Sequence, residues 1–203
     1  MNKNIRKIIL SIFFIGSFLS ISAQGFYNEL FEKYDSYKEE SITIRRFTHS
    51  KIMPLIEELK PDSFFEVNKV GTSIKGKSLN LISFGEGEVD VFLWSQMHGD
   101  ESTATMAIFD IMNFFKSTDF QKEKEEMLSN LRIHFLPMLN PDGAELFTRR
   151  NALGVDINRD AVRLQSPESK TLKRVRDSLE ADFGFNLHDQ STYYNANRTS
   201  KPA

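Results

Sequence analysis

The sequence predicts an α/β protein with a mixed, mainly parallel central sheet flanked by helices. Strand-like and helix-like segments alternate through the second half of the chain. One segment, 89–94, is almost continuously apolar, as expected of a strand that is covered on both faces. The 203 residues, 40% of them hydrophobic, suffice for one domain with a sizeable core.

The first 23 residues differ from the rest and are expected to be a secretory signal peptide. Basic residues at positions 3, 6 and 7 precede an apolar run, 8–21, and the small residues Ser22 and Ala23. This run of about 14 residues is too short to span a bilayer, which requires about 20. The protein is therefore expected to be exported to the periplasm or the extracellular space, with no membrane segment after removal of the peptide.

Composition excludes several kinds of partner and site. The 26 basic and 28 acidic residues give a formal net charge of -2, so no basic field attracts nucleic acid or an anionic membrane. The chain contains no cysteine, which excludes disulfides. A bound metal would therefore require histidine and carboxylate ligands.

The first half of the chain predicts helices followed by a hairpin. Segment 24–60 carries apolar residues at helical spacing, among them Ile52 and Ile56, and Pro61 is expected to end the second helix. Segment 64–83 contains two strand-like stretches around Gly71 and Gly76, which predict a β-hairpin.

The second half predicts alternating strands and helices. Strands are expected over 89–94, 131–138 and 182–187, and helices over 103–115 and 171–179. The charged stretch 116–126 is expected to be a solvated helix face or a loop, and the composition of 139–143 predicts a turn.

Three residues at predicted strand ends are candidate metal ligands. His98 and Glu101 stand three positions apart after a buried strand, so a tight turn would let both side chains converge. This spacing alone is a weak signal. His188 strengthens it because it ends another strand, and the ends of parallel strands are where open α/β sheets bind ligands. The other two histidines, His49 and His134, are expected to be structural.

A loop rich in arginine and amide side chains, 149–160, lies between these candidate ligands. Such groups bind carboxylates and oxyanions. The alternative is a solvated basic loop without a ligand.

Taken together, these segments resemble the zinc carboxypeptidase family typified by carboxypeptidase A. The order of motifs carries the resemblance: His-x-x-Glu after a buried strand, Asn-Pro-Asp-Gly at 140–143, Gly-Val-Asp-Ile-Asn-Arg at 154–159, Ser-Pro-Glu-Ser at 166–169 and Asn-Leu-His at 186–188. The resemblance covers about residues 45–190, and the hairpin residues 70–77 look like the family's entry strands. It implies a carboxypeptidase A-like fold of the phosphorylase/hydrolase-like type, with residues 61–203 forming a partial catalytic domain.

The resemblance also implies a cofactor. His98, Glu101 and His188 would bind one Zn²⁺ per chain and leave an open coordination position for water or the scissile carbonyl.

By the same resemblance, other residues receive roles toward the substrate. Asn158 and Arg159 would hold the terminal carboxylate of a peptide, and Arg149 would polarise the carbonyl and stabilise the oxyanion. Arg150 is the alternative to Arg149, because the length of this loop varies in the family. Asp156 would accept a hydrogen bond from the first zinc histidine and fix its orientation.

The family's general base, a glutamate on a strand well after the third ligand, has no counterpart in this chain. Asp189 follows His188, but alternation along a strand would direct its side chain away from the metal. The chain is therefore expected to be C-terminally truncated, and weak or inactive in this form.

The leading hypothesis is a metallocarboxypeptidase that removes the C-terminal residue of a peptide with a free carboxylate. One alternative is a zinc amidohydrolase of the deacylase branch, which shares the ligand pattern but cleaves N-acyl amino acids. Another is a catalytically dead module that binds peptide C-termini. The side-chain specificity and the oligomeric state stay open.

Overall fold

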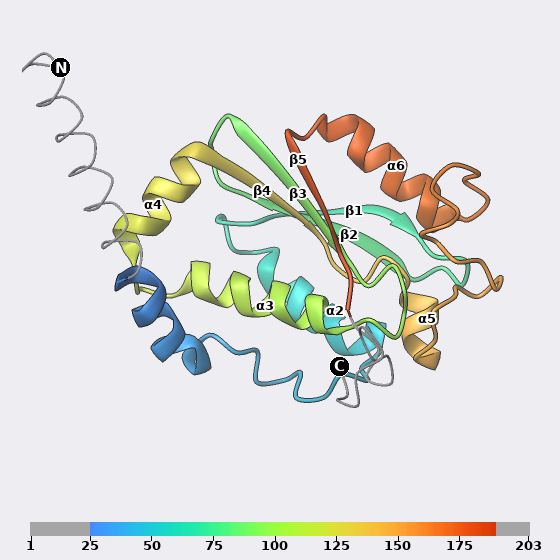
Figure 1. The fold of residues 1–203 in the computed structure, drawn as a ribbon, viewed down its shortest axis with the longest axis horizontal. Coiled ribbons are helices and arrows are strands. Elements are labelled where there is room, and N and C mark those ends of the chain that lie inside the picture. The colour runs from blue at the N-terminus through green and yellow to red at the C-terminus, as the bar shows by residue number, and fades with distance from the viewer. Residues whose placement is uncertain (1–24, 190–203) are drawn as a thin grey trace, which may run out of the picture. The chain divides into compact units, whose positions relative to one another are not determined.

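A computed structural model of the chain describes residues 25–189 (Figure 1). The described residues fall into two compact units that divide between Lys38 and Glu39. In the first unit, residues 25–33 form a helix that leads into the 3₁₀ turn η1, Tyr34–Ser36. The expected signal peptide lies outside the described residues. Among the helices within 25–189, none is long and apolar enough to cross a membrane.

The second unit is built on a five-stranded sheet. Its strands are β1 (Glu66–Thr72), β2 (Ser78–Phe84), β3 (Val89–Ser95), β4 (Leu131–Leu136) and β5 (Phe183–Leu187). They lie in the order β1-β2-β4-β3-β5. The pairs β1–β2 and β2–β4 are antiparallel, whereas β3–β4 and β3–β5 are parallel. The mixed α/β class is thus confirmed, with parallel pairing confined to the three strands of the second half.

Helices flank this sheet. They are α2 (His49–Leu59), α3 (Thr103–Lys116), α4 (Gln121–Asn130), α5 (Pro141–Leu146) and α6 (Pro167–Leu179). Figure 1 shows α2 and α3 on one side of the sheet and α6 on the other.

Alternation along the strands gives the two faces of the sheet different partners. Phe84 of β2 contacts Phe115 of α3, with ring centroids 5.0 Å apart. On the opposite face, Val175 of α6 packs in one buried cluster with Leu81 of β2 and Phe92 of β3. Because both faces are covered at its centre, the sheet rigidly supports the loops that follow β3, β4 and β5.

Two local predictions differ from the structure, and a third holds except at one residue. The expected turn at 139–143 opens helix α5, because Asn140 accepts a hydrogen bond from Gly143 N and Pro141 occupies the first helical position. Helix α6 begins at Pro167 rather than at 171, since Ser166 caps it in the same way. The charged stretch 116–126, expected to be a solvated helix face or a loop, is mostly exposed or half-buried and enters α4. Lys124 is the exception: it is buried and donates to Ser117 O and to two backbone carbonyls near the end of α3.

Candidate metal centre

The turn that follows β3 holds His98 in place. Gln96 has a left-handed backbone (φ 50°), which is unfavourable for a residue with a Cβ. Its buried side chain compensates by donating to Gly99 O at 2.9 Å and accepting from Thr105 Oγ1 at 2.9 Å. Glu101 N donates to His98 O at 3.1 Å, which closes the turn and directs both side chains to the same side.

Two glycines let this turn approach α5. A Cβ atom on Gly99 would lie 2.1 Å from the backbone carbon of Gly143. A Cβ atom on Gly143 would in turn lie 2.7 Å from the carbonyl oxygen of Arg150. No side chain fits at such distances, so glycine at both positions brings the turn, α5 and the arginine loop together.

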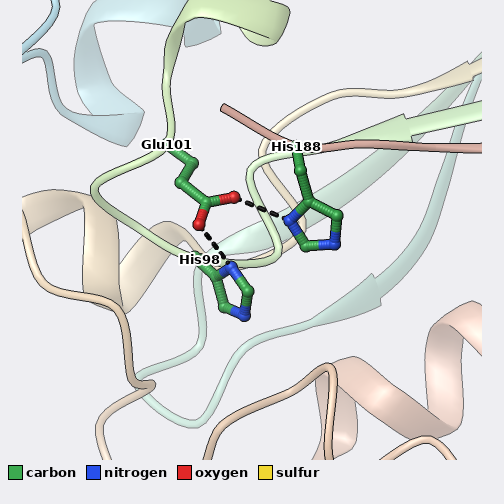
Figure 2. A group of neighbouring side chains, drawn as sticks. All are labelled: His98, Glu101 and His188. Atoms are coloured by element: carbon green, nitrogen blue, oxygen red, sulfur yellow. Dashed lines mark hydrogen bonds and ion pairs between the residues drawn. The ribbon is translucent and has the colours of Figure 1, made fainter. Parts of the chain in front are cut away.

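The structure brings the three candidate ligands into one cluster (Figure 2). Glu101 Oε1 lies 2.7 Å from His98 Nδ1, and its Oε2 lies 2.7 Å from His188 Nδ1. One ligand atom from each residue lies within 4.8 Å of the others. Two imidazole nitrogens and a carboxylate form a donor set that zinc accepts, and three protein ligands leave room for a fourth. The cluster therefore fits a catalytic zinc ion in chemistry and spacing.

Glu101 is held as a carboxylate at the centre of the cluster. Burial would raise its pKa, but hydrogen bonds from His98 and His188 outweigh burial and lower the pKa from 4.5 to about 2. An ionised oxygen pair therefore faces both imidazole rings at neutral pH.

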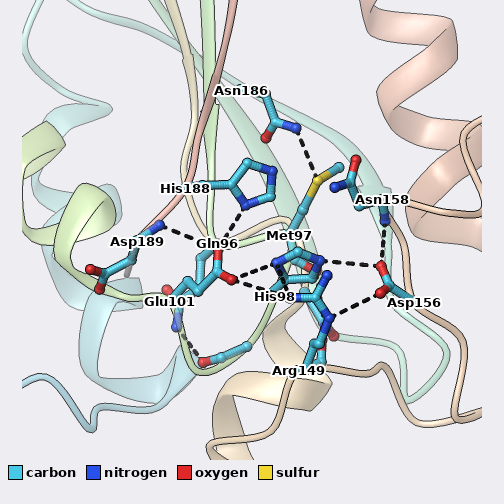
Figure 3. A network of polar contacts seen from close by, with 12 residues as sticks. Gln96, Met97, His98, Glu101, Arg149, Asp156, Asn158, Asn186, His188 and Asp189 are labelled. Atoms are coloured by element: carbon cyan, nitrogen blue, oxygen red, sulfur yellow. Dashed lines mark hydrogen bonds and ion pairs between the residues drawn. The ribbon is translucent and has the colours of Figure 1, made fainter. Parts of the chain in front are cut away.

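Asp156 contacts His98 through the ring nitrogen that does not face Glu101 (Figure 3). His98 Nε2 lies 3.2 Å from Asp156 Oδ1, and Arg149 Nε donates to Asp156 Oδ2 at 3.0 Å. Burial would raise the pKa of Asp156, but these two partners lower it. With Nε2 on Asp156, the His98 ring directs Nδ1 at the cluster, where Nδ1 lies 2.7 Å from Glu101 Oε1.

The two neighbouring arginines point to different places. Arg149 Nη1 lies 3.1 Å from His98 Nδ1 and 3.4 Å from Glu101 Oε1, so its guanidinium group borders the cluster (Figure 3). Arg150 instead donates from Nη1 to Gly154 O at 2.9 Å within its own loop. The geometry therefore favours Arg149 over Arg150 for a role at the cluster.

Asn158 and Arg159 follow Asp156 directly. The backbone N–H of Asn158 donates to Asp156 Oδ1 at 3.0 Å, and the backbone N–H of Arg159 donates to Asp156 O at 3.0 Å. Asn158 is half-buried and Arg159 is exposed. Their assignment to a substrate carboxylate stays a prediction.

The side chain of Asp189 is engaged away from the cluster, although its backbone contacts Glu101. Its Oδ2 accepts from Arg45 Nη2 at 2.5 Å and from Thr103 Oγ1 at 2.6 Å. Its backbone N–H donates to Glu101 Oε2 at 3.3 Å. The side chain thus ties the end of β5 to α3.

The sequence-based predictions gave no role to Asn140, a polar residue beside the cluster. Asn140 is fully buried, and its Nδ2 donates to Met97 O at 3.3 Å and to Arg149 O at 3.2 Å. It therefore links the residue before His98 to the arginine loop. Its membership of the Asn-Pro-Asp-Gly motif was the available signal, but the motif alone predicts no more than a turn.

The two histidines expected to be structural bind elsewhere. His49 Nε2 lies 3.0 Å from Ser78 O, and His134 is hydrogen-bonded between Ser83 and Asp90 at 2.8 Å on each side. His134 also lines a cavity of about 920 Å³ near the start of β4, which none of the three cluster residues lines. The cluster is thus defined by its chemistry rather than by the size of a cavity.

Several sequence relatives of the chain are carboxypeptidases. The family model for zinc carboxypeptidases matches residues 50–199. The catalytic chain of human carboxypeptidase N is 28% identical over 116 residues, which is 46% of this chain and 25% of that protein. Carboxypeptidase E of Caenorhabditis elegans is 31% identical over 119 residues, 48% of this chain and 25% of that protein. The chain thus aligns with about a quarter of the length of these relatives.

Solved structures with the same fold also include carboxypeptidases. The metallo-carboxypeptidase of Pseudomonas aeruginosa, in complex with (2-guanidinoethylmercapto)succinic acid, superposes with a TM-score of 0.63 at 21% identity, over 71% of this chain and 40% of that chain. Carboxypeptidase A of Helicoverpa armigera gives a TM-score of 0.62 at 17% identity, over 81% and 54%. These similarities establish the fold, and the family match covers most of the chain. The chain therefore belongs to the zinc carboxypeptidase family.

Proposed function

We propose that this chain provides the zinc-binding and oxyanion-binding part of a metallocarboxypeptidase that hydrolyses C-terminal peptide bonds. The observation that carries the proposal is the convergence of His98, Glu101 and His188, with one ligand atom each within 4.8 Å. Arg149 borders this cluster, as an oxyanion-stabilising group would have to.

The three cluster residues would hold one Zn²⁺ ion. When bound, zinc supplies a Lewis acid that polarises a carbonyl oxygen and lowers the pKa of a water molecule to about 7. Asp156 would keep the His98 ring in its binding orientation, as the 3.2 Å contact supports. Arg149 would place its guanidinium charge beside the carbonyl oxygen as negative charge develops there.

The substrate would be a peptide with a free C-terminal carboxylate. Asn158 and Arg159 would bind that carboxylate, since an amide and a guanidinium group supply charge-assisted hydrogen bonds to it. The P. aeruginosa enzyme binds a succinic acid derivative, which is also a carboxylate ligand. This likeness supports a carboxylate subsite here.

Catalysis also requires a general base. Among the described residues, the carboxylate of Asp156, which contacts His98, and that of Asp189, the residue after His188, are both already engaged. Asp156 is bonded to His98 and Arg149, and Asp189 to Arg45 and Thr103. A positioned base typically contributes about 10²- to 10⁴-fold. We therefore expect the 203-residue chain to hydrolyse peptides slowly.

Export and domain layout complete the proposal. Residues 1–23 would form a signal peptide, 24–60 an N-terminal helical segment and 61–203 the partial catalytic domain. Residues 50–60, which form most of α2, already fall within the family match.

Zinc titration of the purified chain tests the metal site. We expect one Zn²⁺ per chain in the wild type. Glu101→Ala should show no high-affinity zinc binding, because it removes the carboxylate that is bonded to both His98 and His188. Asp90→Asn is the matched control, because it removes a carboxylate from a histidine outside the cluster. Equal zinc affinity in the wild type and Glu101→Ala would refute the metal site.

Peptide binding by the zinc-loaded chain tests the substrate class. A peptide with a free terminus should bind more tightly than its C-terminally amidated form, and Arg159→Ala should abolish the difference. Losing one charge-assisted hydrogen bond costs about 1.5–3 kcal/mol. Equal affinity for both peptides in the wild type would contradict a carboxypeptidase and favour another amide substrate.

A further inference from the structure

Two buried carboxylates without a role in the proposed function hold the turn between β1 and β2. Glu168, in the first turn of α6, accepts from Ile74 N through Oε1 at 3.2 Å. Asp142, in the first turn of α5, accepts from Lys75 N through Oδ2 at 2.9 Å. Both carboxylates are at most 1% exposed. Three motifs of the family resemblance thus meet at this turn.

The second oxygen of Glu168 reaches the arginine loop. Glu168 Oε2 accepts from Asn151 Nδ2 at 3.3 Å. The Oδ1 atom of Asn151 accepts from Leu153 N and from Val155 N, both at 3.0 Å, and Asn151 N donates to Val155 O at 3.0 Å. Asn151 therefore closes the loop 151–155 on itself, and Glu168 anchors the closed loop to α6.

The closed loop lies between two residues of the proposed site. Arg149 stands two positions before Asn151, and Asp156 directly follows Val155. The bond from Arg149 Nε to Asp156 Oδ2, at 3.0 Å, depends on the distance that this loop sets between them. A change in the conformation of this loop would therefore alter the position of Arg149 relative to Asp156. Because Asp156 is bonded to His98, the orientation of the His98 ring would change as well.

From these contacts we infer that Glu168 is a positioning residue for Arg149 and Asp156, acting through the side chain of Asn151. The inference deepens the proposed function and rests on it, because it assigns Glu168 to the same zinc and oxyanion site. Glu168 would contact neither zinc nor substrate.

The hydrogen bonds at position 168 explain why this residue is a carboxylate rather than an amide. Both oxygens of Glu168 accept a hydrogen bond, so an amide here would turn an NH₂ group toward one of two N–H donors. Burial raises the pKa of Glu168, and the charge of Asp142 adds to that rise. Keeping an acid in this place thus costs folding free energy, and such costs are typical of residues that support a site.

A polarity exchange between Glu168 and Asn151 tests the inference. Glu168→Gln turns an NH₂ group toward either the N–H of Ile74 or the NH₂ of Asn151, so one of the two hydrogen bonds is lost. Asn151→Asp sets two carboxylates against each other. The double variant, Glu168→Gln with Asn151→Asp, restores the bond in reverse, because the amide on α6 then donates to the carboxylate in the loop. In that variant both positions also keep an oxygen for their backbone N–H partners. Ser83→Ala is the control, since it removes one hydrogen bond, to His134 of β4, outside the proposed site.

The full chain is measured in two ways. Hydrogen exchange at the amides of Leu153 and Val155 should become at least about 10-fold faster in each single variant and return close to the wild-type rate in the double variant. Affinity for Zn²⁺ alone should fall about 10-fold in each single variant and recover likewise. Ser83→Ala should leave both quantities unchanged.

The outcomes separate this inference from the proposed function. If Glu101→Ala abolishes zinc binding while folded Glu168→Gln keeps the wild-type affinity and exchange rates, the positioning role is refuted and the metal site stands. If Glu101→Ala also leaves zinc binding unchanged, the proposed function fails. Should Glu168→Gln not fold, Asn151→Ala breaks the same contact from the loop side, and unchanged zinc affinity in that variant overturns the inference.

Discussion

Replacing Asp156 with asparagine changes one charge and one hydrogen-bond donor beside His98. Asp156 is 9% exposed and accepts from His98 Nε2 at 3.2 Å and from Arg149 Nε at 3.0 Å. In Asp156→Asn an NH₂ group must face one of these two donors. Losing a charge-assisted hydrogen bond costs about 1.5–3 kcal/mol. If that loss falls on the orientation of His98, zinc affinity should fall about 10- to 100-fold.

Competition with a chromophoric chelator measures this affinity, and circular dichroism confirms that the variant is folded. Asp90→Asn serves as the matched control, because Asp90 pairs with His134 Nε2 at 2.8 Å outside the cluster. The control should destabilise the protein without weakening zinc binding. A folded Asp156→Asn variant with wild-type zinc affinity would refute the view that Asp156 orients a metal ligand.

Three further predictions address the same region. Arg149→Ala should lower the rate of C-terminal residue release by about 10²- to 10³-fold, whereas Arg150→Ala should leave it unchanged; equal losses would contradict the distinction drawn between them. Gly99→Ala places a Cβ 2.1 Å from the backbone carbon of Gly143 and should lower the free energy of unfolding, measured in urea, by about 1–3 kcal/mol or more. Gly184→Ala is the control and should be tolerated, because its Cβ would meet nothing closer than 3.5 Å. The lowered pKa of Glu101 contributes stability that is complete above pH 4.5 and lost as the pH falls through about 2. Acid should therefore lower the free energy of unfolding more steeply in the wild type than in Glu101→Gln over that interval, and parallel curves of this free energy against pH would argue against the assigned ion pairs.

Most elements of the fold could be predicted because their signals are local. The apolar run at 89–94 became β3, and the hairpin around Gly71 and Gly76 became β1 and β2. Helix α5 and the early start of α6 were missed, although Asn140 and Ser166 are good capping residues. Residues that cap helices also favour turns, so their presence is compatible with a helix start or with a turn. Packing against neighbouring segments decides which of the two forms.

The motif order in the sequence determined the family, and with it which residues are candidates for zinc. The spacing of His98 and Glu101 follows from one short turn, so local sequence nearly determines that contact by itself. The place of His188 beside them is decided by the pairing of β5 with β3, which joins segments about 90 residues apart.

The choice between Arg149 and Arg150 was likewise open in the sequence. In the structure Arg149 contacts His98 and Glu101, whereas Arg150 contacts Gly154 O. Adjacent side chains in a loop can point in any direction, and the direction here follows from contacts with Asp156 and Asn140. The link from Glu168 to Asn151 has the same origin, since it needs α6 to pack against the arginine loop. Local sequence determines which groups are available, whereas their directions depend on contacts between residues far apart in the chain.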